Sequence, residues 1–318
     1  MFITQAFKKE TDFSLILLDF LKYLIGSIIV FFASLFGQIP LGIAILFSGK
    51  TPNSESDIYK LFDSNLFLFL ALLSFVFAMI GLYFVVEKIH RQKFITIITS
   101  REKVDWKRVF LSFGIWVVVS TVLILAAYFY DSSEIIMQFN LVPFLILVGI
   151  TLLFMPIQTS TEELIFRGYL MQGFFNLARN KWFPLVMTSV IFGTMHIMNP
   201  EVEKMGYIIL VYYIGTGLFL GIITLMDEGT ELALGFHAAN NIVASLLITS
   251  DYTVFQTHSI FKDMSEPSMN FEVFFPVLVL FPILIFVFSK IYKWTNWKEK
   301  LIGSKLDLQP EENAHFNQ

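Results

Sequence analysis

Residues 141–175 read LVPFLILVGITLLFMPIQTSTEELIFRGYLMQGFF, a mainly apolar run whose only charged residues are Glu162, Glu163 and Arg167. A helix that crosses the hydrocarbon core of a bilayer needs about 20 mainly apolar residues, so this segment exceeds one straight crossing. It contains Pro156 and then the polar run Gln158-Thr159-Ser160-Thr161. Proline removes a backbone donor and bends a helix. We therefore predict a kinked membrane helix, or a crossing followed by a helix at the membrane interface.

The rest of the chain shares this apolar character. Of the 318 residues, 56% are hydrophobic, 37 are Phe and 15% are charged, whereas about 25% of residues are charged in ordinary globular chains. One water-soluble core cannot bury so much apolar surface. The composition predicts an all-α, polytopic integral membrane protein. The absence of Cys excludes disulfides and thiolate chemistry, and a net charge of −4 without a basic block argues against nucleic acid as a partner.

We expect about eight transmembrane helices. Besides 141–175, the apolar segments lie at 13–47, 66–86, 109–130, 184–198, 206–226, 232–249 and 271–292.

The loops between these segments differ in their cations, which predicts the orientation. The loop at 87–108 holds seven Lys and Arg residues, Arg179 and Lys181 occupy a short link, and five Lys fall within 290–305. The alternate loops at 131–140 and 251–270 hold one Lys between them. The cation-rich side is the cytoplasmic side by the positive-inside rule, so both termini are predicted to be cytoplasmic.

Ionisable residues inside the apolar segments are costly and need an explanation. Asp19 and Lys22 lie three residues apart and are predicted to pair on one helical face. Glu163 and Arg167 are spaced i,i+4 and are predicted to form a salt bridge. Glu162 points about 100° away from Glu163 and has no evident local partner. Such a carboxylate is suited to act as a general base, although both acids could instead share Arg167 and hold helices together.

Two further polar clusters follow in later apolar segments. Residues 192–196 read FGTMH and end in His196, and residues 237–241 read HAANN, in which His237 and Asn241 share a helical face. A lone His is often a hydrogen-bonded core residue, and His237 with Asn241 could form an interhelical clamp. His196 falls deeper along its segment than His237 does along its own. The two therefore meet only if the helix at 184–198 is tilted or begins below the interface.

The three clusters together contain the groups needed for peptide hydrolysis. Glu162 could deprotonate a water that His196 helps to hold, while His237 and Asn241 stabilise the tetrahedral oxyanion. Alternatively, Glu162, His196 and His237 could ligate Zn²⁺ or another divalent metal. Spacing does not decide between these mechanisms, because the residues belong to three separate helices. The metal-free mechanism is equally open.

The three motifs in this order resemble the CPBP family (CAAX protease and bacteriocin-processing) of intramembrane proteases, also called Abi or type II CAAX proteases. The resemblance covers residues 141–249 and implies a helical core with a cavity open toward the cytoplasm. It implies that Glu162 activates water close to His196, and that His237 and Asn241 bind the oxyanion or a ligand. Glu163 and Arg167 match supporting positions. The family is usually filed under metalloproteases, and its metal requirement is disputed.

These observations divide the chain into four parts. Residues 1–140 form three N-terminal membrane helices, 141–250 a CPBP-type catalytic core, 251–306 the last membrane helix with a basic cytoplasmic end, and 307–318 a polar tail. We expect an endopeptidase in the cytoplasmic membrane of a bacterium that cleaves a membrane-associated protein or peptide. The lipid bilayer is the other expected partner.

Two other functions use the same residues. Intramembrane acids and His build proton relays, so an ion- or proton-coupled transporter is one alternative. The chain shows no internal repeat of the kind that many transporters have. The other alternative is a non-catalytic, bacteriocin-immunity-type membrane protein that binds a peptide partner, in which the motifs are structural.

Overall fold

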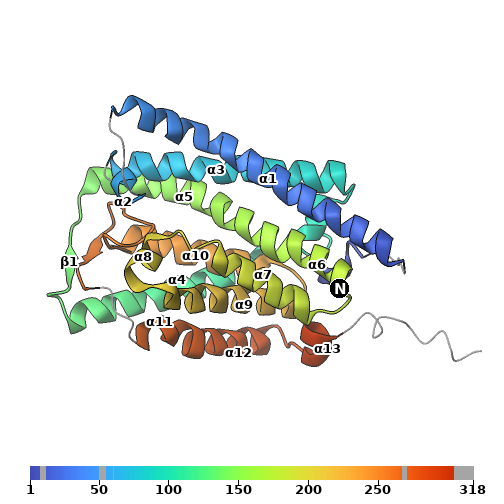
Figure 1. The fold of residues 1–318 in the computed structure, drawn as a ribbon. Coiled ribbons are helices and arrows are strands. Elements are labelled where there is room, and N and C mark those ends of the chain that lie inside the picture. The colour runs from blue at the N-terminus through green and yellow to red at the C-terminus, as the bar shows by residue number, and fades with distance from the viewer. Residues whose placement is uncertain (8–11, 50–54, 60, 267–270, 304–318) are drawn as a thin grey trace, which may run out of the picture.

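The computed structural model describes residues 1–318 except 8–11, 50–54, 60, 267–270 and 304–318. The predicted polar tail at 307–318 lies outside the described residues. The chain folds into packed helices with a few short strands (Figure 1). The helices are α1 (Phe13–Phe47), α2 (Glu55–Tyr59), α3 (Ser64–Phe84), α4 (Trp106–Tyr130), α5 (Leu141–Glu163), α6 (Met171–Ala178), α7 (Trp182–Thr194), α8 (Pro200–Met205), α9 (Leu210–Asp227), α10 (Glu231–Leu247), α11 (Phe271–Phe275), α12 (Phe281–Ile291) and α13 (Trp297–Ile302).

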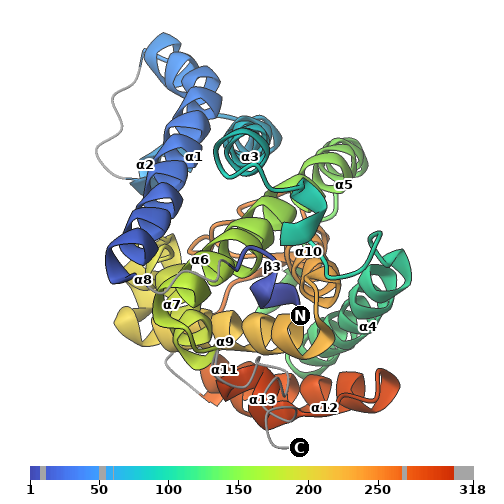
Figure 2. The ribbon, with the colours of Figure 1, turned by 90° about the vertical axis from the view of Figure 1, so that its right-hand side faces the viewer.

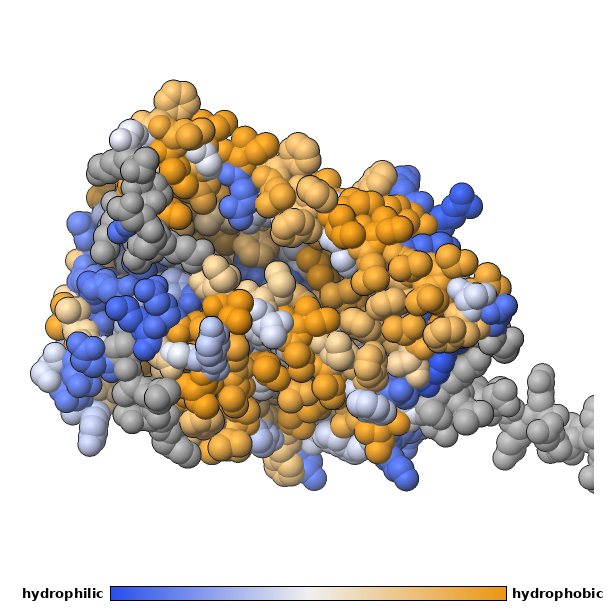
Figure 3. Space-filling view, viewed as in Figure 1, coloured by the Kyte–Doolittle hydropathy of each residue, from blue (hydrophilic) through white to orange (hydrophobic). Residues whose placement is uncertain are grey.

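The prediction of an all-α polytopic membrane protein is confirmed. Six stretches of the described residues are helical, long and apolar enough to cross a membrane. They are Phe13–Phe47, Ser64–Ile89, Trp106–Tyr130, Leu141–Ala178, Tyr207–Asp227 and Val273–Ile291. Their outward faces are apolar over much of the view in Figure 3, with hydrophilic residues gathered toward the two ends.

Six of the eight predicted segments are long enough by themselves to cross a membrane, and the total number of crossings stays a prediction. The predicted segments at 184–198 and 232–249 form α7 and α10, which have 13 and 17 residues. At 1.5 Å per residue these helices are about 20 and 26 Å long, less than a hydrocarbon core of about 30 Å. Both lie among longer helices, since α7 packs on α9, and α10 packs on α4, α5 and α9 (Figure 2).

The segment at 141–175 forms one continuous helix that includes Pro156. Its irregular part comes later than the predicted kink: α5 ends at Glu163, a π-helical segment covers Leu164–Leu170, and α6 follows at once. A π-helical segment inside an α-helix changes which side chains share a face, and such segments are frequent at functional sites.

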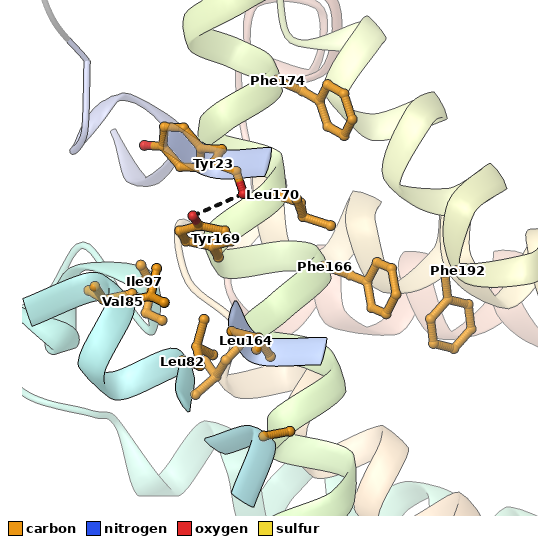
Figure 4. Packing of buried hydrophobic residues seen from close by; sticks show 13 residues of the cluster. Tyr23, Leu82, Val85, Ile97, Leu164, Phe166, Tyr169, Leu170, Phe174 and Phe192 are labelled. Atoms are coloured by element: carbon orange, nitrogen blue, oxygen red, sulfur yellow. Dashed lines mark hydrogen bonds between the residues drawn. The ribbon is translucent and has the colours of Figure 1, made fainter. Parts of the chain in front are cut away.

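Buried apolar side chains hold the π-helical segment in place. Leu164, Tyr169 and Leu170 pack against residues of α1 and of the chain after α3, including Tyr23 and Ile97 (Figure 4). The Tyr169 hydroxyl donates to the backbone oxygen of Tyr23 at 3.2 Å. This packing fixes the helix immediately after the Glu162-Glu163 pair.

The segments predicted to be rich in cations meet at one end of the bundle. Gln172 on α6 donates to the backbone oxygen of Thr96, and Lys181 donates from its backbone nitrogen to Gly303. The N-terminal segment joins the same end, because Gln5 donates to the backbone oxygen of Thr99. The predicted Asp19–Lys22 pair forms, with Nζ and Oδ1 3.9 Å apart.

The opposite end carries a small sheet in the order β1-β3-β2. Strand β1 (Ile135–Met137) pairs antiparallel with β3 (Phe261–Asp263), and β2 (Ile248–Thr249) pairs parallel with β3. Because β2 directly follows α10, the sheet anchors the end of the helix that carries His237.

Helix α10 approaches α4 very closely at Gly235. A Cβ atom at this position would lie 2.1 Å from the backbone oxygen of Val109. We expect Gly235→Leu to lower the melting temperature of the purified protein by about 2–10 °C, since overpacking costs about 1–3 kcal/mol. Gly114→Leu is the matched control, because nothing lies within 4 Å of a Cβ there. Equal melting temperatures for the two variants would contradict the close approach.

Candidate active site

The site is built around a buried ion pair. Glu163 and Arg167 both have fully buried side chains, and Arg167 Nη1 donates to Glu163 Oε1 at 3.0 Å, which confirms the predicted i,i+4 pair. Arg167 Nη2 donates to the backbone oxygen of Gly217 on α9 at 3.3 Å. Its guanidinium lies 4.3 Å from the centre of the Phe192 ring. Arg167 therefore ties the π-helical segment to both α7 and α9.

Glu163 also holds His237, which is 74 residues away in the sequence. The distance between His237 Nδ1 and Glu163 Oε1 is 2.7 Å. A carboxylate paired with Arg only accepts hydrogen bonds, so Nδ1 is the donor and Nε2 is left for other partners. Nε2 faces Glu162 Oε2 at 3.7 Å. The ion pair thus aims one defined nitrogen of His237 at Glu162.

A network of charges fixes the turn before α10. Arg101 contacts both Asp227 Oδ2 and Glu231 Oε2 at 3.1 Å, and Arg108 pairs with the same Asp227. The exposed fractions of the Asp227 and Glu231 side chains are 2% and 0%. Because Glu231 begins α10, this network sets the position of the helix less than two turns before His237.

Glu162 lies at the edge of the buried pair. Its side chain is 17% exposed, whereas that of Glu163 is fully buried. The expectation that Glu162 has no local partner is wrong, because Gln158 Nε2 donates to Glu162 Oε1 at 2.6 Å. Gln158 stands four residues earlier on the same helix. The i,i+4 rule that identified the Glu163–Arg167 pair could have identified this one.

His196 lies beyond the end of its helix. Helix α7 ends at Thr194, so His196 sits in the following turn rather than inside a helix at 184–198. Nδ1 donates to the backbone oxygen of Phe192 at 2.8 Å, because a carbonyl can only accept. The ring stacks on Tyr213 with a centroid distance of 4.3 Å. This arrangement leaves Nε2 of His196 for other partners.

The Phe192 ring links the two predicted catalytic histidines. Its centre lies 4.8 Å from the ring of His196 and 6.1 Å from that of His237. The sequence predicts different depths in the membrane for the two histidines, yet both lie beside the same Phe192 ring. Within the described ranges, no hydrogen bond joins His196 to Glu162 or His237. His196 and His237 therefore share Phe192 as a neighbour without a hydrogen bond between them.

Asn241 is already engaged in a hydrogen bond. Its Nδ2 donates to Gln158 Oε1 at 2.9 Å. This bond uses one of the two amide hydrogens, so the predicted oxyanion role depends on the other. Gln158, Asn240 and Trp116 also belong to this polar network and were not among the predicted site residues. The polar run after Pro156 marks Gln158, whereas nothing in the spacing links Trp116 to the site.

The predicted metal ligands do not form a metal centre in this arrangement. Among the residues that the structure describes, no three His, Asp or Glu side chains are close enough to share an ion. The hydrogen bonds of both histidines use Nδ1 and that of Glu162 uses Oε1, so Nε2 of each histidine and Glu162 Oε2 keep the lone pairs that a metal ligand needs. The donor chemistry therefore fits a divalent ion, whereas the separations among Glu162, His196 and His237 do not.

Comparison with known proteins shows that the segment carrying the site is similar to a known family. Residues 141–243 match the family model described as type II CAAX prenyl endopeptidase Rce1-like. This range includes all three motifs and confirms the resemblance seen in the sequence. The chain is also 29% identical over 281 residues to the "Uncharacterized protein YyaK" of Bacillus subtilis (strain 168), covering 87% of this chain and 89% of the relative. No solved structure matches the chain.

Proposed function

Because residues 141–243 match the family model described as type II CAAX prenyl endopeptidase Rce1-like, we propose that the protein is an intramembrane endopeptidase. It hydrolyses a peptide bond in a membrane-associated protein or peptide. The observation that carries the proposal is the position of Glu162. Its carboxylate is partly accessible, and its Oε2 faces Nε2 of a histidine that a buried ion pair holds.

In the proposed reaction Glu162 acts as the general base. It takes a proton from a water molecule while the water oxygen forms a bond to the carbonyl carbon of the substrate. The carbonyl oxygen becomes an oxyanion, which the imidazolium form of His237 stabilises from Nε2. The carbon–nitrogen bond then breaks, and Glu162 returns its proton to the leaving amine.

The surrounding residues support these two groups. The Glu163 carboxylate stabilises positive charge on His237 through the 2.7 Å contact at Nδ1. Arg167 in turn neutralises Glu163, so the ionised pair can stay buried. In this proposal His196 Nε2 holds the attacking water, and Asn241 contributes its second amide hydrogen to the oxyanion.

The protein is proposed to lie in the cytoplasmic membrane of a bacterium with both termini in the cytoplasm. The positive-inside rule supports this orientation, because the cation-bearing segments gather at one end of the bundle. The link that follows α6 belongs to that end. A substrate anchored in the cytoplasmic leaflet would approach the site from this side.

The separations among the predicted ligands favour the metal-free form of the mechanism. Dialysis of the detergent-purified protein against EDTA is expected to leave its cleavage rate unchanged, because no three His, Asp or Glu side chains of the described residues lie close enough to share an ion. The assay uses an internally quenched peptide in which a farnesylated cysteine is the fourth residue from the carboxyl terminus. A loss of cleavage that added Zn²⁺ restores would contradict this prediction and show that the ligands rearrange around a metal.

A further inference from the structure

A row of hydrogen bonds leads from the general base away from the reacting centre. Gln158 Nε2 donates to Glu162 Oε1 at 2.6 Å, and Asn241 Nδ2 donates to Gln158 Oε1 at 2.9 Å. Asn240 Nδ2 donates to Asn241 Oδ1 at 3.1 Å, and Trp116 Nε1 donates to Asn240 Oδ1 at 3.1 Å. Four consecutive bonds therefore connect Trp116 to Glu162.

The chemistry at both ends fixes the direction of every bond. The indole N–H of Trp116 can only donate, and the ionised carboxylate of Glu162 can only accept. Each of the three amides between them receives on its oxygen and donates from its nitrogen. Reversing the oxygen and nitrogen of one amide would place two donors face to face on one side of it and two acceptors face to face on the other side. The row therefore has one consistent arrangement, in which Glu162 Oε1 receives a hydrogen bond.

The row crosses three helices that are distant in the sequence. Trp116 lies on α4, Asn240 and Asn241 on α10, and Gln158 and Glu162 on α5. Trp116, Gln158 and Asn241 are 5%, 6% and 8% exposed, so water competes little for these bonds. Hydrogen bonds between buried polar groups strengthen one another where the dielectric constant is low.

Primary amides and an indole do not exchange protons readily near neutral pH, in contrast to carboxylates and imidazoles. A row made only of such groups orients its end group and does not conduct protons. This property separates the row from the relays that a proton-coupled transporter would need.

We propose that Gln158 is a positioning residue for Glu162, held in its orientation by Asn241, Asn240 and Trp116. The inference rests on the proposed function, in which Glu162 is the base. Gln158 saturates Oε1, which leaves Oε2 directed toward His237 and the water. It also stabilises the ionised carboxylate in an environment with little water.

The test compares pH–rate profiles of purified variants on the farnesylated quenched peptide and on a panel of acylated membrane peptides. Gln158→Leu is expected to lower kcat about 10- to 100-fold, the size of a lost hydrogen bond to a charged group, with little change in KM. The acidic limb of the profile should move to higher pH, because the Glu162 carboxylate loses a hydrogen-bond donor. The other charged groups facing Glu162 are unchanged: His237 from α10, His196 after α7, and Glu163 and Arg167 on its own helix.

Asn240→Leu is the second variant, because it is close to Asn in shape, adds no charge and lies at a position without a hydrogen bond to Glu162. Its side chain neither accepts from Trp116 nor donates to Asn241, so the row breaks at its first two links. We expect the same upward shift of the acidic limb and a smaller loss of kcat, about 3- to 10-fold. If the row served only to pack the helices, breaking it would lower the stability of the protein and leave the acidic limb of the pH–rate profile in place.

Gln172→Leu is the matched control. Gln172 is a buried Gln on α6 of the same continuous helix, 1% exposed, with hydrogen bonds to Thr96, Phe2 and Gln92. It has no contact with the row, so its removal should leave the acidic limb in place even if stability falls.

The outcomes separate the inference from the proposed function. If Glu162→Gln is inactive while Gln158→Leu and Asn240→Leu keep the wild-type profile, the positioning role is overturned and the proposed function stands. If the wild-type protein cleaves no peptide, or Glu162→Gln cleaves as fast as the wild type, the proposed function fails and the inference fails with it. An upward shift in both row variants and none in Gln172→Leu supports the inference.

Discussion

Glu162→Gln is expected to lower the rate of peptide cleavage about 100- to 10,000-fold, the range over which a general base contributes. The amide keeps the shape of the side chain and cannot take a proton from water. Substrate binding should change little, so the loss falls on kcat. The measurement is steady-state cleavage of the farnesylated quenched peptide by protein reconstituted in lipid nanodiscs.

Glu203→Gln is the matched control for this variant. Glu203 is an exposed residue of α8 that belongs to none of the three motifs, and the same chemical change there should leave the rate unaltered. The melting temperature of each variant shows that the fold is kept. A Glu162→Gln protein that melts like the wild type and cleaves at its rate would exclude Glu162 as the base.

Arg167→Met is expected to destabilise the protein by about 3–5 kcal/mol, because it leaves the charge of Glu163 buried without its guanidinium partner and with only the hydrogen bond from His237. Both side chains are fully buried, so water cannot replace the lost guanidinium. The contact with the Gly217 backbone oxygen is lost as well. Unfolding of the detergent-solubilised protein by a denaturing detergent measures the change.

The double variant Glu163→Gln with Arg167→Met separates the charge from the packing. It removes the unpaired charge, so it should recover part of the stability that Arg167→Met loses. Arg167→Lys should fall between wild type and Arg167→Met, since an ammonium group keeps the charge without the planar fork that reaches two partners. If the double variant is less stable than Arg167→Met, the buried charge is not the cause of the loss.

Local spacing predicted the contacts that lie within one helix. The Glu163–Arg167 and Asp19–Lys22 pairs follow from their distances along the chain, and both form. The membrane class follows from the apolar composition. The Gln158–Glu162 bond obeys the same i,i+4 rule and went unpredicted because Gln158 carries no charge, although a buried amide needs partners as a charge does.

Other features depend on which helices pack together, and spacing carries no such information. His237 meets Glu163 across 74 residues and Trp116 meets Asn240 across 124. The predicted helix at 184–198 extends too far because Ile197 and Met198 are apolar. The helix ends earlier in the structure, before Pro200. A residue that precedes a proline disfavours helical backbone, and Asn199, which precedes Pro200, is extended with a ψ angle of 145°.

The most direct test of the proposed hydrolysis is to follow water into the product. Wild-type protein in nanodiscs is incubated with the peptide panel in water enriched in ¹⁸O, and the fragments are analysed by mass spectrometry. The expected result is a fragment whose new carboxyl terminus carries one ¹⁸O atom with the wild type, and no such fragment with Glu162→Gln. Labelled fragments formed equally by both proteins, or none formed by the wild type, would contradict a water-activating role for Glu162.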